Sequence, residues 1–481
     1  MAVKLKKTGT CKYTIPKEHN PGMRVPGVVY TDERLLDDLQ EDGCLEQVAN
    51  VAHLPGIVGA SLAMPDIHMG YGFAIGGVAA TDVATGVISP GGVGYDINCG
   101  VRLITSTLDE SDVRPRIDEL LGALFSSIPV GTGSKGKVKL STAELREVAQ
   151  KGAGWAVSKG YGVKQDLICC EEAGAMDGAD PDSVSSKAYA RGEKQIGTLG
   201  AGNHFIEVAV VDAICDEECA RAFGLRTKQV VFWIHSGSRG LGHQVCTEYI
   251  KLMIEAVKKY NISLPDRQLV CAPVRSPEGE RYYGAMAAAA NFAWANRQVM
   301  THWLREAVSR TFHTSADQLG MHLLYDVAHN IAKIETHTVD GQNRALCVHR
   351  KGATRSFGPG HPLVPDKYRR VGQPVLVPGD MGRSSYIMAG TEQAMRESFG
   401  SCCHGAGRLM SRSSAKKSIS GRELQKQLAA QGTKVRAGHI GSLAEEAPEV
   451  YKDIDIVADI AHQAGLGKKV ARLVPIGVIK G

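Results

Sequence analysis

The sequence predicts an α+β fold (mixed α/β) in one large domain spanning residues 1–481. Val208–Val211 and Gln229–Ile234 are rich in β-branched and aromatic residues, which is typical of buried strands. A long alanine-rich stretch from Tyr283 to Thr311 has the composition of a buried helix. Because no internal repeat or low-complexity linker divides the chain, a single domain is favoured over independent modules.

The overall composition is that of a soluble globular protein, with 43% hydrophobic and 22% charged residues. Lys and Arg exceed Asp and Glu by 56 − 51 = 5, so the chain is mildly basic, which permits a polyanionic partner without requiring one. The 12 cysteines are irregularly spaced and are therefore interpreted as reduced. With no apolar N-terminal region and no run of roughly 18 apolar residues, we expect a cytoplasmic protein without a membrane segment.

Before residue 130, the local patterns predict two helices, a strand and one shaped loop. Lys4–Asn20 alternates polar and apolar residues, as in a strand that leads to a turn, whereas Asp32–Val51 and Asp112–Ile128 have helical amphipathicity. The segment 62–72 is rich in glycine, so we expect a loop there. Asp66 and His68 in this segment suit a metal pair or a proton-handling pair, and the alternative is an aspartate that caps a turn.

The glycine-rich stretch Gly91–Gly100 concentrates metal-binding groups in flexible backbone. Asp96 offers a hard oxygen and Cys99 a soft sulfur, three positions apart. His204, His235 and His329 follow in segments near predicted strand ends or the end of an apolar run. Five ligands are too many for one tetrahedral structural ion, so we predict two ions that share the Cys99 thiolate.

In this arrangement Asp96 and His204 complete one metal site, and His235 and His329 complete the other. Ligand softness alone would assign zinc to such a site. Taken singly, each histidine is more often structural than a ligand, but the glycine-rich surroundings of the set favour metal binding.

Several small-residue or cationic segments suggest that the substrate carries phosphate. Ser236–Gly240 is a tight turn that contains Arg239, and Val348–Arg355 holds four potentially cationic side chains in eight residues. A short strand at Val375–Val377 opens onto the loop Pro378–Tyr386, which is suited to bringing backbone amides to phosphate or ribose. In the long helix, Asn291, Asn296 and Arg297 either line the site or make internal hydrogen bonds.

The segment Ser401–Arg408 has the features of a loop for covalent catalysis. Gly405 and Ala406 leave space beside His404 for an incoming phosphorus atom, and Arg408 and Arg412 supply positive charge. The alternative is a buried structural histidine. The apolar terminal stretch from residue 472 to 481 is expected to dock onto the domain rather than fray.

Six motifs carry a family resemblance across nearly the whole chain. They are MPDIH at 64–68, GVGYDINCG at 92–100, GTLG at 197–200 followed by NHFIE at 203–207, HSGSRG at 235–240, VHRKGATR at 348–355, and HGAGR at 404–408. Together they resemble the RtcB family of tRNA-splicing RNA ligases, which join 2′,3′-cyclic phosphate or 3′-phosphate ends of RNA to 5′-hydroxyl ends. The resemblance implies central β-sheets flanked by helices.

The resemblance also implies dependence on GTP and on two Mn²⁺ ions, with His404 attacking the α-phosphorus of GTP to form a histidine-GMP intermediate. The implied metal ligands are Asp96, Cys99, His204, His235 and His329, with Cys99 bridging. The implied guanylate pocket comprises Asn203, His204, Phe205, Ile206, Glu207, His329, Asn330, Pro378, Gly379, Asp380, Met381, Ser385, Gly405, Ala406, Gly407, Tyr451 and Lys480. Candidates for RNA or phosphate contacts are Asp66, Arg191, Arg239, Lys351, Arg408 and Arg412.

The implied partners are RNA, as tRNA halves or cleaved RNA, and an archease-like activator protein. The role of Asp66 stays open between orienting His404 and assisting the 5′-hydroxyl. Two rival functions are a dinuclear metal-dependent phosphoesterase acting on RNA, which needs no nucleophilic histidine, and a basic RNA-binding protein with a structural metal.

Overall fold

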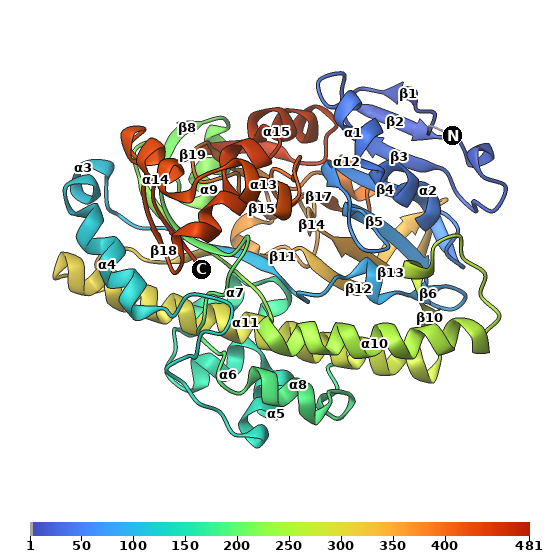
Figure 1. Cartoon of the computed structure of the whole chain (residues 1–481), viewed down its shortest axis with the longest axis horizontal. Helices are drawn as coiled ribbons and strands as arrows, with labels where there is room; N and C mark the ends of the chain where they lie inside the picture. Colours follow the sequence, from blue (N-terminus) through green and yellow to red (C-terminus); the bar gives the residue numbers. More distant parts are fainter. Residues whose placement is uncertain (1–2) are drawn as a thin grey trace.

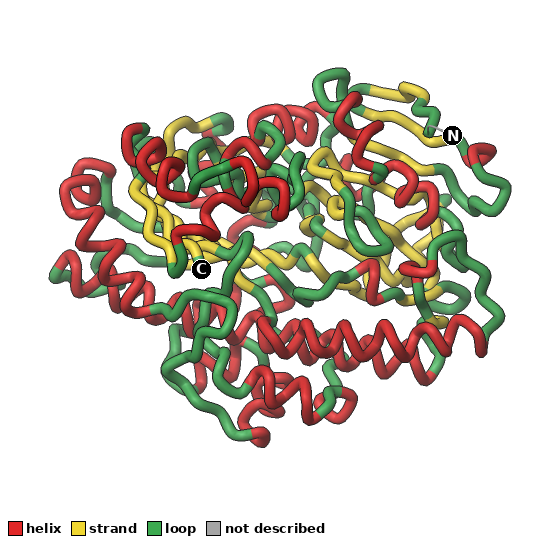
Figure 2. Tube along the Cα trace, in the orientation of Figure 1, coloured by secondary structure: helices red, strands yellow, loops and turns green. Residues whose placement is uncertain are grey.

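The computed structural model describes residues 3–481, so the first two residues of the predicted domain lie outside it. It combines two large β-sheets and two short ribbons with helices packed around them (Figure 2). This confirms the predicted α+β class. The strands and helices below are labelled as in Figure 1.

The first large sheet has seven strands in the order β1-β2-β3-β4-β5-β13-β12, all antiparallel except for the parallel pair β3 and β4. Its strands are β1 (Lys6–Gly9), β2 (Lys12–Ile15), β3 (Gly27–Tyr30), β4 (Ile57–His68), β5 (Ile75–Asp82), β12 (Asn330–Val339) and β13 (Gln342–Lys351). The last residue of β4 and the first of β12 lie beside the functional cavity described below.

The second large sheet has the order β11-β7-β9-β8-β19-β16-β15, and β18 pairs with β19 outside this path. Its strands are β7 (Gly100–Ile104), β8 (Phe205–Ile214), β9 (Val230–Ser236), β11 (Leu323–Ala328), β15 (Pro374–Val377), β16 (Ser385–Ala389), β18 (Lys434–Ala437) and β19 (Lys468–Lys480). The predicted strands at 208–211 and 229–234 lie in β8 and β9. The predicted docking of the final apolar segment is also confirmed, because β19 lies between β8 and β16.

Two short antiparallel ribbons complete the strand pairing. One joins β6 (Val87–Ile88) to β10 (Ala272–Pro273), and the other joins β14 (Ala353–Arg355) to β17 (Ser401–Cys403). His404 follows β17 directly, so the second ribbon anchors the segment that carries it.

Two long helices, α10 (Arg239–Lys259) and α11 (Pro277–Phe312), run along one side of the sheets (Figure 1). The predicted helix 283–311 is confirmed as part of α11, which begins earlier because Ser276 caps it and Pro277 occupies its first turn. The other helices are α1 (Leu36–Asp42), α2 (Cys44–Val51), α3 (Glu110–Val113), α4 (Ile117–Ser127), α5 (Thr142–Lys151), α6 (Ala153–Ser158), α7 (Lys164–Ile168), α8 (Ser186–Gly192), α9 (Glu217–Phe223), α12 (Glu392–Glu397), α13 (Arg412–Ser418), α14 (Gly421–Ala430) and α15 (Ile454–Gln463). Across residues 3–481, none of the helices combines the length and apolar character needed to span a bilayer.

The largest error in the local predictions concerns the segment 62–72. Residues up to His68 belong to the twelve-residue strand β4, which pairs with β3 and β5. Pro65 is tolerated there because the register with β5 shifts between Ala63 and His68, where no regular ladder bond is required. The predicted helix at 32–51 is likewise two helices, separated by Gly43 at a φ of 77°.

Candidate active site

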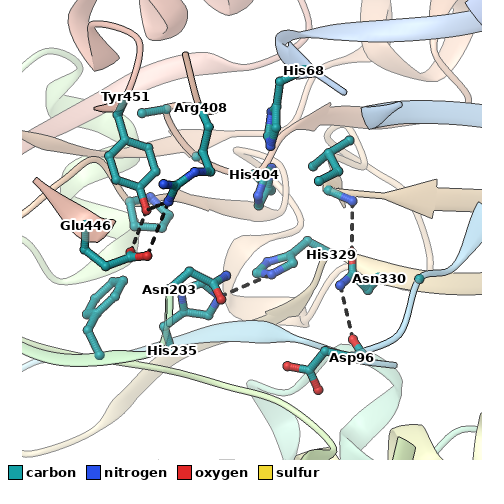
Figure 3. Close-up of a pocket in the computed structure, with 18 of the residues that line it drawn as sticks. His68, Asp96, Asn203, His235, His329, Asn330, His404, Arg408, Glu446 and Tyr451 are labelled. Atoms are coloured by element: carbon teal, nitrogen blue, oxygen red, sulfur yellow. Dashed lines mark hydrogen bonds and ion pairs between the residues drawn. The ribbon is translucent and has the colours of Figure 1, made fainter. Parts of the chain in front are cut away.

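A cavity of about 380 Å³ is lined by residues of both large sheets, and most of the predicted site residues lie in its wall (Figure 3). Its walls include the start of β8, the residues between β11 and β13, the loop after β15, the loop after β17, and the end of β19. A volume of this size is within the range of small-molecule sites in proteins.

The first group of candidate metal-binding atoms comes from Asp96, Cys99 and His204. His204 Nε2 lies 2.8 Å from Asp96 Oδ2 and 3.3 Å from Cys99 Sγ. On the other side of the ring, His204 Nδ1 donates to the carbonyl oxygen of Leu199 at 2.8 Å. In a neutral ring, this bond leaves a lone pair on Nε2, so three electron-rich atoms converge on one point, as in a metal site.

The second group comes from Cys99, His235 and His329. Cys99 Sγ lies 3.2 Å from His235 Nε2, which is in turn 3.2 Å from His329 Nε2. Burial lowers the pKa of both histidines well below the usual value, so both rings are neutral and can offer lone pairs. The two groups share the sulfur of Cys99, which is the arrangement expected for a bridging thiolate.

The protonation of these groups indicates that the site fits a cation. Burial, with the nearby Asp96 charge, raises the pKa of the Cys99 thiol well above its usual value, so a thiolate at this position needs positive charge beside it. The Nδ1 atoms of His235 and His329 are buried and make no hydrogen bond to residues 3–481. Hydrogen bonds at Nδ1 therefore do not explain why these two histidines are buried here, whereas a metal ion held by their Nε2 atoms would explain it.

Backbone geometry and α11 hold the ligand loops in place. A Cβ at Gly237 would lie 2.3 Å from Asp96 Oδ1, so only glycine lets the β9–α10 turn approach that carboxylate. Arg297, fully buried on α11, donates to the backbone oxygens of Asn98 and Ser236, which precede and follow metal-ligand positions. The same guanidinium pairs with Asp326, which compensates its buried charge.

His404 is oriented by Asp66. The carboxylate atom Asp66 Oδ2 accepts hydrogen bonds from His404 Nδ1–H at 2.6 Å and from the His404 backbone N–H at 3.0 Å. Because Asp66 holds the proton on Nδ1, a neutral His404 ring carries its lone pair on Nε2. That atom makes no hydrogen bond to any residue between 3 and 481, and the side chain retains 15% exposure on the cavity wall. This geometry favours the orienting role of Asp66 over the alternative.

Gly407 permits the contact between Asp66 and His404. Its φ is 75°, and a Cβ there would lie 2.2 Å from the carbonyl oxygen of Asp66. Any larger residue would push the loop after β17 away from β4 and separate the two side chains. The motif HGAGR therefore requires glycine here for steric reasons.

One end of the cavity combines buried charges with aromatic rings. Glu446 accepts from the Tyr451 hydroxyl at 2.6 Å and from Arg408 Nη1 at 3.3 Å (Figure 3). It also accepts from Lys480 Nζ at 3.1 Å. Lys480 Nζ also lies 5.7 Å from the centre of the Phe205 ring. We call this end the first arm of the cavity.

Glu207 completes the first arm and carries an unusual charge state. Its Oε1 atom is buried and has no hydrogen-bond partner within residues 3–481. Burial, helped by the nearby Asp380 carboxylate, raises the pKa of Glu207 to about 8. A carboxyl group of this kind is ready to accept hydrogen bonds from a ligand that brings its own N–H donors.

Comparison with known proteins gives a consistent result over the whole chain. The family described as "tRNA-splicing ligase RtcB" matches residues 47–481. The chain belongs to the RtcB family. Curated relatives named tRNA-splicing ligase RtcB are 56% identical over 477 residues in Archaeoglobus fulgidus, 56% over 469 in Methanococcus maripaludis and 54% over 479 in Thermococcus kodakarensis. Each alignment covers at least 98% of this chain and at least 98% of the relative.

Most of the residues expected in the RtcB guanylate pocket line this cavity, but three do not. Those in its wall are Asn203, Phe205, Glu207, His329, Asn330, Pro378, Gly379, Asp380, Met381, Gly405, Ala406, Gly407, Tyr451 and Lys480. Ile206 points into the core between Phe205 and Glu207, because neighbouring residues on β8 face opposite sides of the sheet. Ser385 lies behind the wall, where its hydroxyl accepts from the Gly379 N–H at 3.0 Å, and His204 lies among the metal-binding atoms.

The RNA candidates of this RtcB-family protein divide into two groups. Lys351, Arg408 and Arg412 are in the cavity wall. Arg191 and Arg239 are outside it: Arg191 donates to Gln244 Oε1, and Arg239 to Thr198 Oγ1 and the carbonyl of Gly131. The second group can reach RNA only beyond the cavity.

The prediction of an anion site at Val348–Arg355 is mostly wrong. Arg350 pairs with Glu335 across the β12–β13 ladder, and Arg355 pairs with Glu172, so both guanidinium groups are neutralised inside the protein. His349 is buried and accepts from the Ser89 N–H. Of the four basic side chains in this segment, only that of Lys351 reaches the cavity. Its Nζ donates to the carbonyls of Tyr71 and Phe73, and burial lowers its pKa to about 7.

Sequence reasoning missed Glu446, which joins Lys480, Tyr451 and Arg408 into one network. Its only local signal was the acidic character of residues 445–453, which resembles an ordinary solvated segment. Asn291 and Asn296 do not line the cavity: Asn291 bonds to the backbone of Met176 and Ala149, and Asn296 to that of Thr198. The alternative of internal hydrogen bonding was therefore the correct one for both.

Proposed function

We propose that the protein is a GTP- and Mn²⁺-dependent RNA ligase that joins 2′,3′-cyclic phosphate or 3′-phosphate ends of RNA to 5′-hydroxyl ends. The proposal rests mainly on His404, whose Nε2 is free on a cavity wall while Asp66 holds its Nδ1 proton. The two groups of metal-binding atoms lie beside it, with the His404 and His329 ring centres 4.7 Å apart. A phosphoesterase would need the metal donors but not this histidine.

In the proposed first step, His404 Nε2 attacks the α-phosphorus of GTP, and a P–N bond forms as pyrophosphate leaves. Asp66 keeps the ring oriented and stabilises the positive charge that develops on it. The guanylate then moves from His404 to the RNA 3′-phosphate, after hydrolysis of the cyclic phosphate where one is present. In the last step the 5′-hydroxyl oxygen attacks this phosphate, GMP leaves, and the hydroxyl proton is released.

The metal ligands in this proposal are Asp96, Cys99 and His204 for one ion and Cys99, His235 and His329 for the other. Bound Mn²⁺ would supply positive charge for phosphate oxygens. Manganese is preferred to zinc because a triphosphate site calls for a labile ion of higher coordination number, although the soft thiolate favours zinc.

The first arm suits a guanine base. Glu207 can accept from the guanine N1–H and N2–H groups, and Lys480 can donate to O6. Phe205 and Tyr451 offer aromatic faces for stacking. Arg408 contacts Glu446 and Tyr451, so it belongs to this guanylate arm. Lys351, Arg412, Arg191 and Arg239 remain the candidates for RNA phosphates.

The proposed setting is tRNA splicing or RNA repair in the cytoplasm, with RNA as substrate and an archease-like protein as activator. The free state of all twelve cysteines supports a reducing compartment. The relatives support the substrate class through their name, tRNA-splicing ligase RtcB.

The direct test is a joining assay with purified protein, GTP and MnCl₂. One RNA carries a 2′,3′-cyclic phosphate and the other a 5′-hydroxyl, and the expected product is a single joined strand that requires both GTP and the metal. Release of inorganic phosphate without joining, at a rate independent of GTP, would instead identify a phosphoesterase.

The raised pKa of Glu207 predicts that guanine binding depends on pH. Because its pKa is about 8 in the free protein and a bound guanine requires the carboxylate, binding below pH 8 should release a proton. We expect the affinity for guanosine to rise by up to about tenfold per pH unit between roughly pH 6 and 8. Calorimetry in buffers of different ionisation enthalpy measures both the affinity and the proton released.

The Glu207→Gln variant is the control for this effect, since it should bind guanosine weakly and without the pH dependence. It should also change stability in a defined direction. The pKa of Glu207 is raised in the folded protein from its ordinary value of 4.5 to about 8. Ionisation of Glu207 therefore lowers the free energy of unfolding as the pH rises from about 4.5 towards 8. The glutamine variant should lack this loss of stability. Wild-type affinity that is flat with pH would contradict the assigned role.

Asp66→Asn tests the orienting role of Asp66. The amide keeps the shape of the side chain but removes the charge that holds the Nδ1 proton, so the rate of His404 guanylylation should fall roughly 10²- to 10⁴-fold. Guanosine affinity should change by less than about threefold because Asp66 does not reach the first arm. Normal guanylylation with defective joining would show that Asp66 acts on the 5′-hydroxyl instead.

A further inference from the structure

The cavity continues beyond the metal donors into a second arm, lined by Tyr71, Pro90, Gly94, Tyr95, Cys246 and Lys351. In Figure 3, Glu446 and Tyr451 lie on one side of His404, while Asn330 and Asp96 lie on the other. Tyr95 precedes Asp96, and a Cβ at Gly94 would lie 3.8 Å from the side chains of Asn330 and Lys351. The second arm therefore extends from the side of His404 opposite the first arm.

Aromatic rings form one wall of the second arm. The Tyr95 ring centre lies 5.9 Å from that of Tyr71 in an edge-on arrangement and 5.0 Å from that of His243 in a tilted one. Tyr95 is 37% exposed, and neither tyrosine hydroxyl makes a hydrogen bond to a residue within 3–481. The ring of Tyr95 thus packs beside two neighbouring rings and still exposes part of its surface in the cavity wall.

Basic groups border this aromatic surface. Lys351 Nζ is held by the carbonyl of Tyr71 at 2.5 Å, and no carboxylate lies within ion-pair distance of it among residues 3–481. Arg191 donates to Gln244 Oε1 at 3.0 Å, and burial together with the nearby Arg191 charge lowers the pKa of His243. Aromatic rings with basic groups nearby are the pattern by which proteins bind single-stranded nucleic acid, since bases stack on rings and phosphates bind to cations.

We propose that Tyr95, supported by Tyr71 and His243, stacks on the base of the terminal nucleotide of the 5′-hydroxyl strand. This inference rests on the proposed ligase function. In the joining step the attacking hydroxyl and the departing GMP lie roughly in line across the phosphorus. With the guanine in the first arm, the hydroxyl approaches from the opposite side, which is where the second arm lies.

The strand assignment and the stacking can be tested together with 2-aminopurine, a base whose fluorescence falls when it stacks. The probe is placed at the 5′ terminus of a 5′-hydroxyl oligoribonucleotide and titrated with wild-type protein, Tyr95→Phe and Tyr95→Leu. Quenching is expected with the first two proteins and not with Tyr95→Leu. Tyr260→Leu, at the far end of α10, is the matched control and should quench as wild type does.

Affinity gives an independent measure of the same contact. Tyr95→Leu should weaken binding of the 5′-hydroxyl strand roughly 5- to 100-fold, and an abasic 5′-terminal nucleotide should weaken wild-type binding by a similar factor. The two changes remove the same contact, so combining Tyr95→Leu with the abasic nucleotide should weaken binding little more than either change alone. Joining rates, normalised to guanylylated His404, should follow the same order.

Three results would overturn the inference: no quenching although fluorescence anisotropy shows binding, equal quenching with Tyr95→Leu, or quenching that depends on Tyr95 only when the probe is at the terminus of the 3′-phosphate strand. Absence of any oligonucleotide binding would overturn it as well. Tyr95-dependent quenching in a protein that joins no RNA would instead retain the subsite and refute the ligase function, so the two failures are distinguishable.

Discussion

Replacing His404 with alanine is expected to abolish covalent labelling of the protein by GTP. Wild-type protein incubated with MnCl₂ and GTP labelled at the α-phosphate should acquire label that is stable to base and labile to acid, as expected for a phosphoramidate. Removing the proposed nucleophile should reduce labelling at least about 10⁴-fold, below detection. RNA joining should be lost to the same extent, because in the proposed mechanism the guanylate that activates the 3′-phosphate comes from His404.

The matched control is His313→Asn, at the exposed end of α11, where φ is 53° and asparagine is tolerated. It should label as wild type does, which excludes a general effect of removing a histidine. Labelling of both wild type and His404→Ala, or of neither in the presence of manganese, would show that the proposed mechanism is wrong.

Cys99→Ala has the second largest expected effect, because the Cys99 sulfur belongs to both groups of metal-binding atoms. Its loss leaves each group with two protein ligands, so we expect both Mn²⁺ ions to bind weakly and guanylylation to fall roughly 10³-fold or more. The fold should survive, since removing the thiol group of one buried cysteine costs only about 1 kcal/mol in an otherwise intact core. Metal content by mass spectrometry and a thermal melt without metal test both statements.

Cys271→Ala is the control for this variant. Cys271 is as deeply buried as Cys99 but lies in the small core cluster around Leu54 and Phe73, away from the metal donors. It should lose a similar amount of stability and retain both ions and full guanylylation. Guanylylation retained by Cys99→Ala would rule out the bridging thiolate.

Some of the site was predictable because its information is local. Asp96 and Cys99 lie three residues apart in a glycine-rich stretch, and His204 and His235 lie at the ends of recognisable strands. Ligand atoms converge where strands end, so this pattern indicated a shared centre before any distance was known. The structure places Cys99 in both groups of candidate metal ligands, with Asp96 and His204 in one group and His235 and His329 in the other, which is the grouping predicted from the sequence.

The errors arose where the deciding partner is distant in the sequence. Nothing near Arg350 shows that Glu335 will neutralise it from the opposing strand, and nothing near residue 64 shows that β3 and β5 will order that segment as a strand. Glu446 was missed for the same reason, because its partner Lys480 lies on β19, 34 residues further along the chain. Ile206, in contrast, could have been excluded by applying the two-residue alternation of a strand to Phe205 and Glu207.

The position of β19 has a consequence for how the protein acquires its function. Phe205 and Lys480 are paired neighbours on β8 and β19 although they are far apart in the chain, and both line the first arm. Long-range pairings of this kind form late and slowly in folding. Partly folded chains should therefore possess the metal loop without the ability to retain guanine, and nucleotide binding should report completed folding more faithfully than helix content does.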